Sequence, residues 1–271
     1  MEKKAWPYVA GMLDAEGTFQ IAVDRRPNGI TGMSLQITIS NTDIRLMKWL
    51  SSNFGGKFYR RKNQRGFSTK DSPDIYFWFM FGKQNQEAFL LGVLPHIVAK
   101  KQEAVLALEF VRMTGWNKDR KLQIAEEMKA AKVGDLEKDR KENLVKLTPS
   151  EMSAFAAGVF DGDGSIGQSV ELTQKRLILM RWFLMCFGGR FDQRSMNGGK
   201  TYFRWRLSGK KNKKEFLLDL VPHLLLKKEQ AKNLLNSIEK GSATTDMLST
   251  PPGVKTQSEL TGDSKSDSTK T

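Results

Sequence analysis

A short pattern occurs twice in this chain, and no other feature constrains the fold as strongly. The first copy is VAGMLDAEG over residues 9–17, and the second is AAGVFDGDG over residues 156–164. Each copy is a run of small and apolar residues that ends in two acids and a glycine. Two copies of one unit can bring their acids together, and carboxylates are the oxygen ligands that hard divalent cations prefer.

The repeat extends beyond this pattern, because later landmarks recur in the same order. They are a Phe-Gly-Gly turn, a Gly-Lys pair before an asparagine, and a Pro-His pair before two lysines: 53–58 and 186–191, 82–85 and 209–212, 95–104 and 222–231. Short motifs alone give many false matches, but collinear landmarks do not. The period is too long for a solenoid or propeller. The sequence therefore predicts a duplicated subdomain.

Hydrophobic periodicity predicts an α-β-β-α-β-β-α order for each unit, which makes the fold class α+β with two pseudosymmetric halves and antiparallel sheets. In the first unit we expect the following helices (H) and strands (E): H 6–13, E 18–23, E 34–40, H from 42 or 43 to 53, E 57–61, E 75–81, H 84–93 and H 95–113. The second unit repeats this order in residues 149–240.

Composition divides the chain into four segments. We expect an N-terminal half at 1–114, a charged, partly helical and solvated linker at 115–147, a C-terminal half at 148–240 and a disordered tail at 241–271. The tail lacks aromatic residues and cannot bury enough apolar surface to offset the entropy of ordering it.

Charge and cysteine content limit the class of protein. The formal net charge is +14, which favours a polyanionic partner, although solvated surface lysines would give the same balance. The single cysteine, Cys186, excludes an internal disulfide and fits a reducing compartment. No apolar run is long enough to span a membrane, and the N-terminus has no convincing signal peptide.

The two acidic patterns resemble the LAGLIDADG motif of the homing endonucleases, in the single-chain form that carries two motifs. The resemblance implies sheets that form a DNA-binding saddle and a monomer with two active sites at the base of the motif helices. It also implies cleavage of double-stranded DNA with a staggered break, a short 3′ overhang and Mg²⁺ as cofactor. Metal ions activate water and neutralise a leaving oxygen, so this hydrolysis needs no covalent nucleophile.

The resemblance assigns roles within the motif. Glu16 and Asp163 match the metal-binding acids, and the backbone carbonyls of Ala15 and Gly162 can assist them. Glu16 departs from the commoner aspartate by one methylene, which can alter metal geometry on that side. The preceding acids, Asp14 and Asp161, are expected to make local turn hydrogen bonds.

Further candidates follow from equivalent positions in the two units. Lys100 and Lys227 match the active-site lysine of the family, which supports the attacking water and the charged transition state. Asn41 and Gln174 resemble its water-positioning amide. For each of these residues a surface role is the alternative. Ala10, Gly11, Ala157 and Gly158 predict that the motif helices pack unusually closely.

DNA contacts are expected on the outer faces of the sheets, where alternate residues share a side. Counting in twos gives Gln20, Ala22, Asp24, Arg26, Gln36, Thr38, Lys57, Tyr59, Arg61, Arg190, Asp192, Arg194, Arg204 and Arg206. A slip of one residue would invert this assignment, and phosphate contacts by these residues are as plausible as base contacts. The second unit lacks most of its first hairpin, which predicts narrower readout there and an asymmetric target.

Two other functions use the same surface. The chain could assist splicing of a host-intron RNA as a maturase, or it could bind DNA without cleaving it. Intact Glu16 and Asp163 favour the endonuclease over the inactive binder. An intein is not expected, because no splice-junction residues bracket the chain. The compartment is expected to be whichever one holds the host genome.

Overall fold

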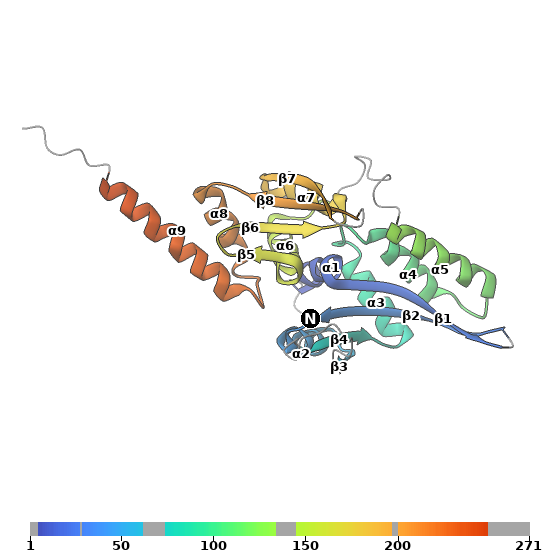
Figure 1. Ribbon diagram of the computed structural model, residues 1–271. Coiled ribbons are helices and arrows are strands. Elements are labelled where there is room, and N and C mark those ends of the chain that lie inside the picture. The colour runs from blue at the N-terminus through green and yellow to red at the C-terminus, as the bar shows by residue number, and fades with distance from the viewer. Residues whose placement is uncertain (1–4, 28, 62–73, 134–144, 197–199, 249–271) are drawn as a thin grey trace, which may run out of the picture.

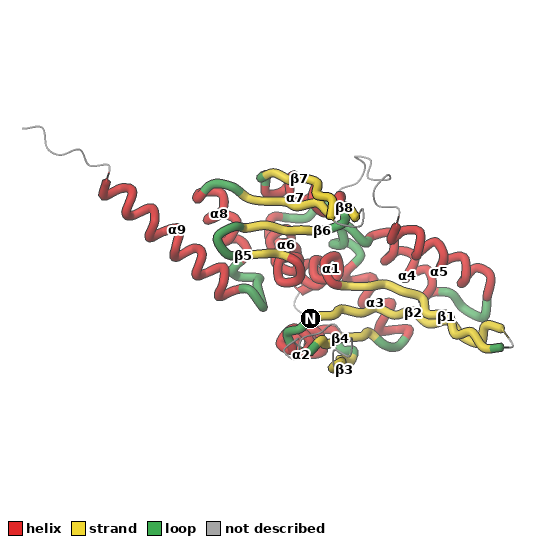
Figure 2. Tube along the Cα trace, in the orientation of Figure 1, coloured by secondary structure: helices red, strands yellow, loops and turns green. Residues whose placement is uncertain are grey.

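The computed structural model describes residues 5–27, 29–61, 74–133, 145–196 and 200–248. Two helices lie side by side at the centre, and each half of the chain adds one sheet beside them (Figures 1 and 2). The chain thus folds as two similar α+β halves, as the repeat predicts. Among these residues, no helix is both long and apolar enough to cross a membrane.

The first half follows the predicted order of elements. Its helices and strands are α1 (Ala5–Glu16), β1 (Gly17–Arg26), β2 (Gly29–Asn41), α2 (Ile44–Phe54), β3 (Lys57–Arg61), β4 (Ile75–Met80), α3 (Lys83–Val93) and α4 (Lys101–Arg112). Asp43 begins α2 as its N-cap by accepting the amide N–H of Arg45.

The second half repeats the order with a shorter first hairpin. Its elements are α6 (Pro149–Asp163), β5 (Gly164–Ile166), β6 (Val170–Gln174), α7 (Leu177–Phe187), β7 (Arg190–Met196), β8 (Lys200–Leu207), α8 (Lys210–Leu220) and α9 (Lys228–Leu248). Thr148 and Glu151 form a capping box at the start of α6. A tight turn joins β5 to β6, where the N–H of Gly167 donates to the carbonyl of Ser169 at 3.0 Å.

Both sheets are antiparallel and have the same strand order, β1-β2-β4-β3 in one and β5-β6-β8-β7 in the other. One face of each sheet covers the core, where Ile37, Trp78 and Trp205 are fully buried. Trp78 pairs with Phe58, and Trp205 pairs with Phe191, so the two sheets share one register. The alternation of strand residues between core and solvent is therefore confirmed.

The motif helices α1 and α6 touch through their backbones. A Cβ added at Gly11 would lie 2.0 Å from the carbonyl oxygen of Phe155, and one at Gly158 would lie 2.0 Å from that of Tyr8. Ala10 is fully buried beside this contact. Only glycine permits such an approach, and the close packing predicted for these helices is confirmed.

The repeated Phe-Gly-Gly turn ends α2 and α7. The second glycine of each turn, Gly56 and Gly189, has a φ of 78° and 83°. This left-handed conformation favours glycine. The indole N–H of Trp78 donates to the carbonyl of Gly55 at 2.9 Å, and that of Trp205 donates to Gly188 at 2.8 Å. The repeat thus preserves one turn and its anchor.

Three expectations about the elements were wrong. The helix predicted from Pro95 begins at Lys101, and residues 95–100 form a turn instead. The linker was expected to be partly helical and solvated; it does contain a helix, α5 (Lys118–Val133), but the Ile124 and Met128 side chains of this helix are buried against α4 and β1. Helix α9 continues past the predicted start of the tail to Leu248, and residues 249–271 lie outside the described part.

Candidate active site

The last acids of the two motifs meet where α1 and α6 end. Glu16 and Asp163 are the final residues of these helices. A Cβ added at Gly162 would lie 2.6 Å from the Cβ of Ala15 and 3.2 Å from the Cγ of Glu16. The side chain of Glu16 therefore crosses to the other half and lies beside the residue that precedes Asp163. The structure brings the two predicted metal-binding acids together.

Burial perturbs the pKa of both acids, and the charge of Asp163 adds to the perturbation of Glu16. Burial, together with the negative charge of Asp163, raises the pKa of Glu16 to about 7. Burial also raises the pKa of Asp163, while Lys100 and the hydrogen bond from Gln174 oppose that rise. Two adjacent, partly buried carboxylates are a setting in which a cation is favourable, and such perturbation is common at functional sites.

A lysine from each half anchors the base of the motif helix in that half. The Nζ of Lys100 donates to the carbonyls of Leu13 at 2.7 Å, Gly17 at 2.6 Å and Ala15 at 3.4 Å. Burial lowers the pKa of Lys100 to about 8.

Lys227 makes the equivalent contacts in the second half. Its Nζ donates to the carbonyls of Phe160 and Gly164, both at 2.7 Å, and to Gly162 at 3.2 Å. Burial lowers its pKa as well. The carbonyls of Ala15 and Gly162, expected to assist a metal, thus also accept hydrogen bonds from these lysines.

The first acid of each motif holds the turn that carries the lysine of the same half. Asp14 accepts the backbone N–H groups of Val98, Ala99 and Lys100, each at 2.8 Å. Its expected role in hydrogen bonding is confirmed, but the expectation of a local turn was wrong, because these partners lie more than 80 residues away. Residues 98–100 are not helical, since their N–H groups donate to this carboxylate and not to preceding carbonyls.

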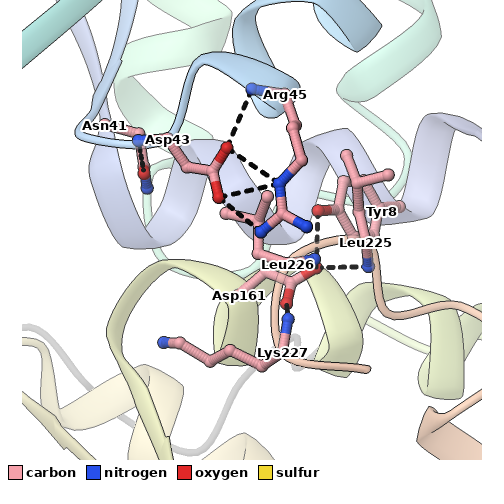
Figure 3. Close-up of polar contacts among 8 residues, drawn as sticks. All are labelled: Tyr8, Asn41, Asp43, Arg45, Asp161, Leu225, Leu226 and Lys227. Carbon is pink, nitrogen blue, oxygen red and sulfur yellow. Dashed lines mark hydrogen bonds and ion pairs between the residues drawn. The ribbon is translucent and has the colours of Figure 1, made fainter. Parts of the chain in front are cut away.

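Asp161 repeats this arrangement with one added partner. It accepts the N–H groups of Leu225, Leu226 and Lys227 at 2.7, 3.1 and 2.8 Å. The hydroxyl of Tyr8, from the other half, also donates to it at 2.8 Å. Figure 3 shows this cluster facing the start of α2. Burial and the charge of Asp161 raise the pKa of Tyr8, so this hydroxyl stays protonated.

The two predicted amides occupy equivalent strand positions but make different contacts. Gln174 donates through Nε2 to the carboxylate of Asp163. The Oδ1 of Asn41 instead accepts the N–H of Asp43 at 2.9 Å (Figure 3). Asn41 still lines an open cleft of about 500 Å³ that Glu16 and Lys227 also line. Asn41 thus lies near the lysine of the other half, whereas Gln174 bonds the acid of its own half.

A buried ion pair joins the halves beside Lys100. The guanidinium of Arg176 donates to the carbonyl of Ala99 at 2.8 Å and pairs with the carboxylate of Glu103. These side chains are only 12% and 3% exposed. Comparing the two halves could not identify this pair, because Asp43 and Gln230 stand at the equivalent positions.

The donor set fits a hard divalent cation. Glu16 and Asp163 offer carboxylate oxygens, and Mg²⁺ is usually held by one or two carboxylates while it keeps several waters. Within the described residues, no group of three or more His, Cys, Asp or Glu side chains is placed to hold a metal. A cage made only of protein side chains is therefore not built here, and the remaining ligands would be water and substrate oxygens.

The outer face of the first sheet carries the side chains that counting in twos along the strands predicted for it. Register pairs Gln20 with Gln36 and Thr38 with Phe79, while Tyr59 pairs with Phe77. On β1, Asp24 accepts a hydrogen bond from Thr31 and forms an ion pair with Arg26. By the same alternation, this outer face also carries Ala22, Lys57 and Arg61.

The equivalent face of the second sheet is a charged network. Asp192 accepts hydrogen bonds from Arg206 at 2.8 Å, Arg194 at 3.4 Å and Arg204 at 3.5 Å. Arg190 pairs with Arg206 across the strands. The structure places all four arginines on one face, as the alternation predicts.

Comparison with known proteins agrees with this arrangement. Residues 9–75 match the family model described as LAGLIDADG endonuclease. The LAGLIDADG homing endonuclease I-SmaMI bound to cleaved DNA is 16% identical, covers 90% of this chain and 92% of its own, and has a TM-score of 0.63. I-GzeII in complex with its DNA target is 16% identical over 90% and 92%, with a TM-score of 0.59. No curated protein sequence matches the chain.

These findings define the class. The chain has the fold of the single-chain LAGLIDADG homing endonucleases across both halves. The sequence matches the LAGLIDADG endonuclease family model over residues 9–75, and the fold matches that of I-SmaMI over 89% of the chain.

Proposed function

We propose that this protein is a site-specific DNA endonuclease that requires a divalent metal, with Mg²⁺ as the natural ion. It makes a staggered double-strand break at a long and asymmetric target. The observation that carries the proposal is the meeting of Glu16 and Asp163 between Lys100 and Lys227. Related structures support it, because I-SmaMI is known bound to cleaved DNA and, with calcium ions, bound to its uncleaved target.

Glu16 and Asp163 would hold the metal, and the carbonyls of Ala15 and Gly162 lie next to them. When bound, the ion supplies an activated water and neutralises the charge that develops on the leaving oxygen. The protein's own residues have other tasks. Lys100 and Lys227 place positive charge where the pentacovalent phosphate gains negative charge. Gln174 orients the carboxylate of Asp163, and Asn41 lines the cleft where water can enter.

The sheets would bind the duplex on their outer faces. Basic side chains near the strand ends supply the non-specific affinity, since lysine and arginine neutralise phosphates. The net charge of +14 agrees with that role. Polar side chains along the strands supply contacts to base edges in the major groove. The shorter β5-β6 hairpin would cover fewer base pairs than the β1-β2 hairpin, so the two half-sites differ in extent.

The test is cleavage selection on a randomised duplex library with Mg²⁺, followed by assays on the selected target. Glu16→Gln and Asp163→Asn should lower cleavage at least about a hundredfold while duplex binding is retained. Lysine variants then separate the two sites, because each lysine lies beside one of them. Lys100→Met and Lys227→Met should each slow the cutting of one strand, and the strand should differ between them.

A surface lysine provides the matched control. Lys129 is exposed on α5 and pairs only with its helix neighbour Glu126 among the described contacts, so Lys129→Met should cut like the wild type. A wild type that binds duplex tightly but cuts no library member would contradict the proposal and favour a cleavage-inactive binder. Tight binding of host-intron RNA without duplex binding would favour a maturase instead.

A further inference from the structure

A column of aromatic side chains lies on the outer face of the first sheet. Phe77, Phe79 and Phe81 alternate along β4 and just beyond it, with ring centroids 6.4 Å and 5.9 Å apart. Tyr59 on β3 contacts Phe79 at 6.0 Å. Tyr59 is 53% exposed and Phe81 is 46% exposed. This face points away from the core, which Trp78 fills from the other side.

Amide side chains border this aromatic column. A hollow of about 530 Å³ lies over the sheet, lined by Gln20, Gln36, Thr38, Tyr59, Phe77 and Phe79. A contiguous apolar surface rimmed by polar groups is characteristic of a binding site. Arg61 lines the same hollow and supplies positive charge at its edge.

The second half carries different chemistry at the matching positions. Register pairs Tyr59 with Phe77 in the first sheet, and Asp192 with Arg204 in the second. The next outward pair is Lys57 with Phe79 in the first sheet and Arg190 with Arg206 in the second. Two aromatic rings are thus replaced by two guanidinium groups at the same places in the same fold.

These side chains discriminate between bases in the major groove. Phenylalanine makes apolar contact with the C5-methyl group of thymine, and glutamine forms paired hydrogen bonds with N6 and N7 of adenine. Gln20 and Gln36 face each other across β1 and β2, next to the phenylalanines. Phenylalanines that contact thymine methyl groups therefore lie beside glutamines that can bond adenine, and this combination suits A·T pairs. Arginine instead suits O6 and N7 of guanine, as on the second sheet.

We propose that the half-site under the first sheet is rich in A·T pairs, with thymine methyl groups seated on Phe77 and Phe79, while the half-site under the second sheet contains guanine. This inference rests on the proposed function, because it names the substrate of that DNA-binding surface. The two halves of one pseudosymmetric fold therefore select half-sites of opposite composition.

The test removes only the methyl groups. Thymines in one half of the selected target are replaced by deoxyuridine, which keeps base pairing, and the Kd for the duplex is measured at fixed salt. Each methyl group that loses its contact should weaken binding roughly fourfold. The loss should occur in the half-site under the first sheet and not in the other.

Matched variants assign the effect to the protein. Phe79→Ser should abolish the sensitivity to deoxyuridine, whereas Arg206→Ser, at the equivalent position, should keep it and relax the guanine preference in the other half. Tight duplex binding with equal affinity for thymine and deoxyuridine targets would overturn the inference while the proposed function stands. Stronger binding of single-stranded RNA, lost in Phe79→Ser, would also overturn it by assigning the rings to unpaired bases. Absence of any duplex binding would overturn both proposals.

Discussion

At the scale of the residue, the proposed role of Glu16 as a metal ligand would connect its protonation to metal binding. Burial and the nearby Asp163 raise its pKa to about 7, so the carboxyl is largely protonated at about pH 6. A divalent ion needs the carboxylate and must displace this proton. The apparent affinity for Mg²⁺ should therefore rise as pH increases towards about 7 and level off above about 8.

Isothermal titration of the protein with Mg²⁺ at several pH values checks this expectation. Proton release on binding should be seen below about pH 7 and should vanish above about pH 8. The Glu16→Gln variant should bind more weakly and lose the part of the profile that titrates near pH 7. An affinity that is constant between about pH 6 and 8 would contradict it.

The sequence predicted much of this site because the repeat marks equivalent residues. Glu16, Asp163, Lys100 and Lys227 lie together as expected from their places in the two units. Asn41 shows the limit of this reasoning. Its position is equivalent to that of Gln174, but its amide accepts the N–H of Asp43, because Asp43 caps a helix where the second half has Arg176.

At the scale of the element, the stability of the molecule depends on the contact between α1 and α6. Gly11→Ala would place a methyl group 2.0 Å from a backbone oxygen, and neither helix can move without disturbing the core. We expect a loss of at least about 2 kcal/mol in the free energy of unfolding, even though alanine favours helix by up to about 1 kcal/mol. Gly158→Ala should behave alike.

Chemical denaturation measures this loss, and Gly167 provides the control. A Cβ at Gly167 meets nothing within 4 Å, and Gly167 is not among the glycines with positive φ. Gly167→Ala should therefore change the free energy of unfolding by less than about 0.5 kcal/mol. Equal stability of the Gly11→Ala and Gly167→Ala variants would show that the helices do not pack as described.

Element boundaries were predictable where local patterns decide them. Alternation located the strands, and Asp43 indicated the start of α2. The turn at residues 95–100 was not predictable, because the carboxylate of Asp14 that holds it is distant in sequence. The packed face of α5 had a signal in the spacing of Ile124 and Met128, but the surrounding lysines and acids obscured it.

At the scale of the whole molecule, the halves share a framework and differ in what joins them. The Arg176–Glu103 ion pair lies between the second half and α4 of the first, beside the turn that carries Lys100. At the equivalent place between the halves, an open cleft of about 500 Å³ adjoins Lys227 instead. The surroundings of Lys100 are thus closed by a buried contact between the halves, and those of Lys227 are open.

Because this ion pair is buried, its single variants and its double variant should differ in their free energy of unfolding. Removing one partner leaves an uncompensated buried charge, so Arg176→Met or Glu103→Leu should each lower the free energy of unfolding by about 3–5 kcal/mol. The double variant replaces both charges with apolar groups and should recover most of that loss. Removing the exposed Lys129–Glu126 pair should cost less than about 1 kcal/mol.

A double-mutant cycle in urea measures the coupling, because it isolates the interaction between the two side chains. A strongly favourable coupling free energy is expected, because each single variant leaves one buried charge unpaired and the second substitution removes that charge. If the two single losses simply add in the double variant, the two charges are not coupled. The same variants would then leave the turn at Lys100, and with it the rate of cutting one strand, unchanged.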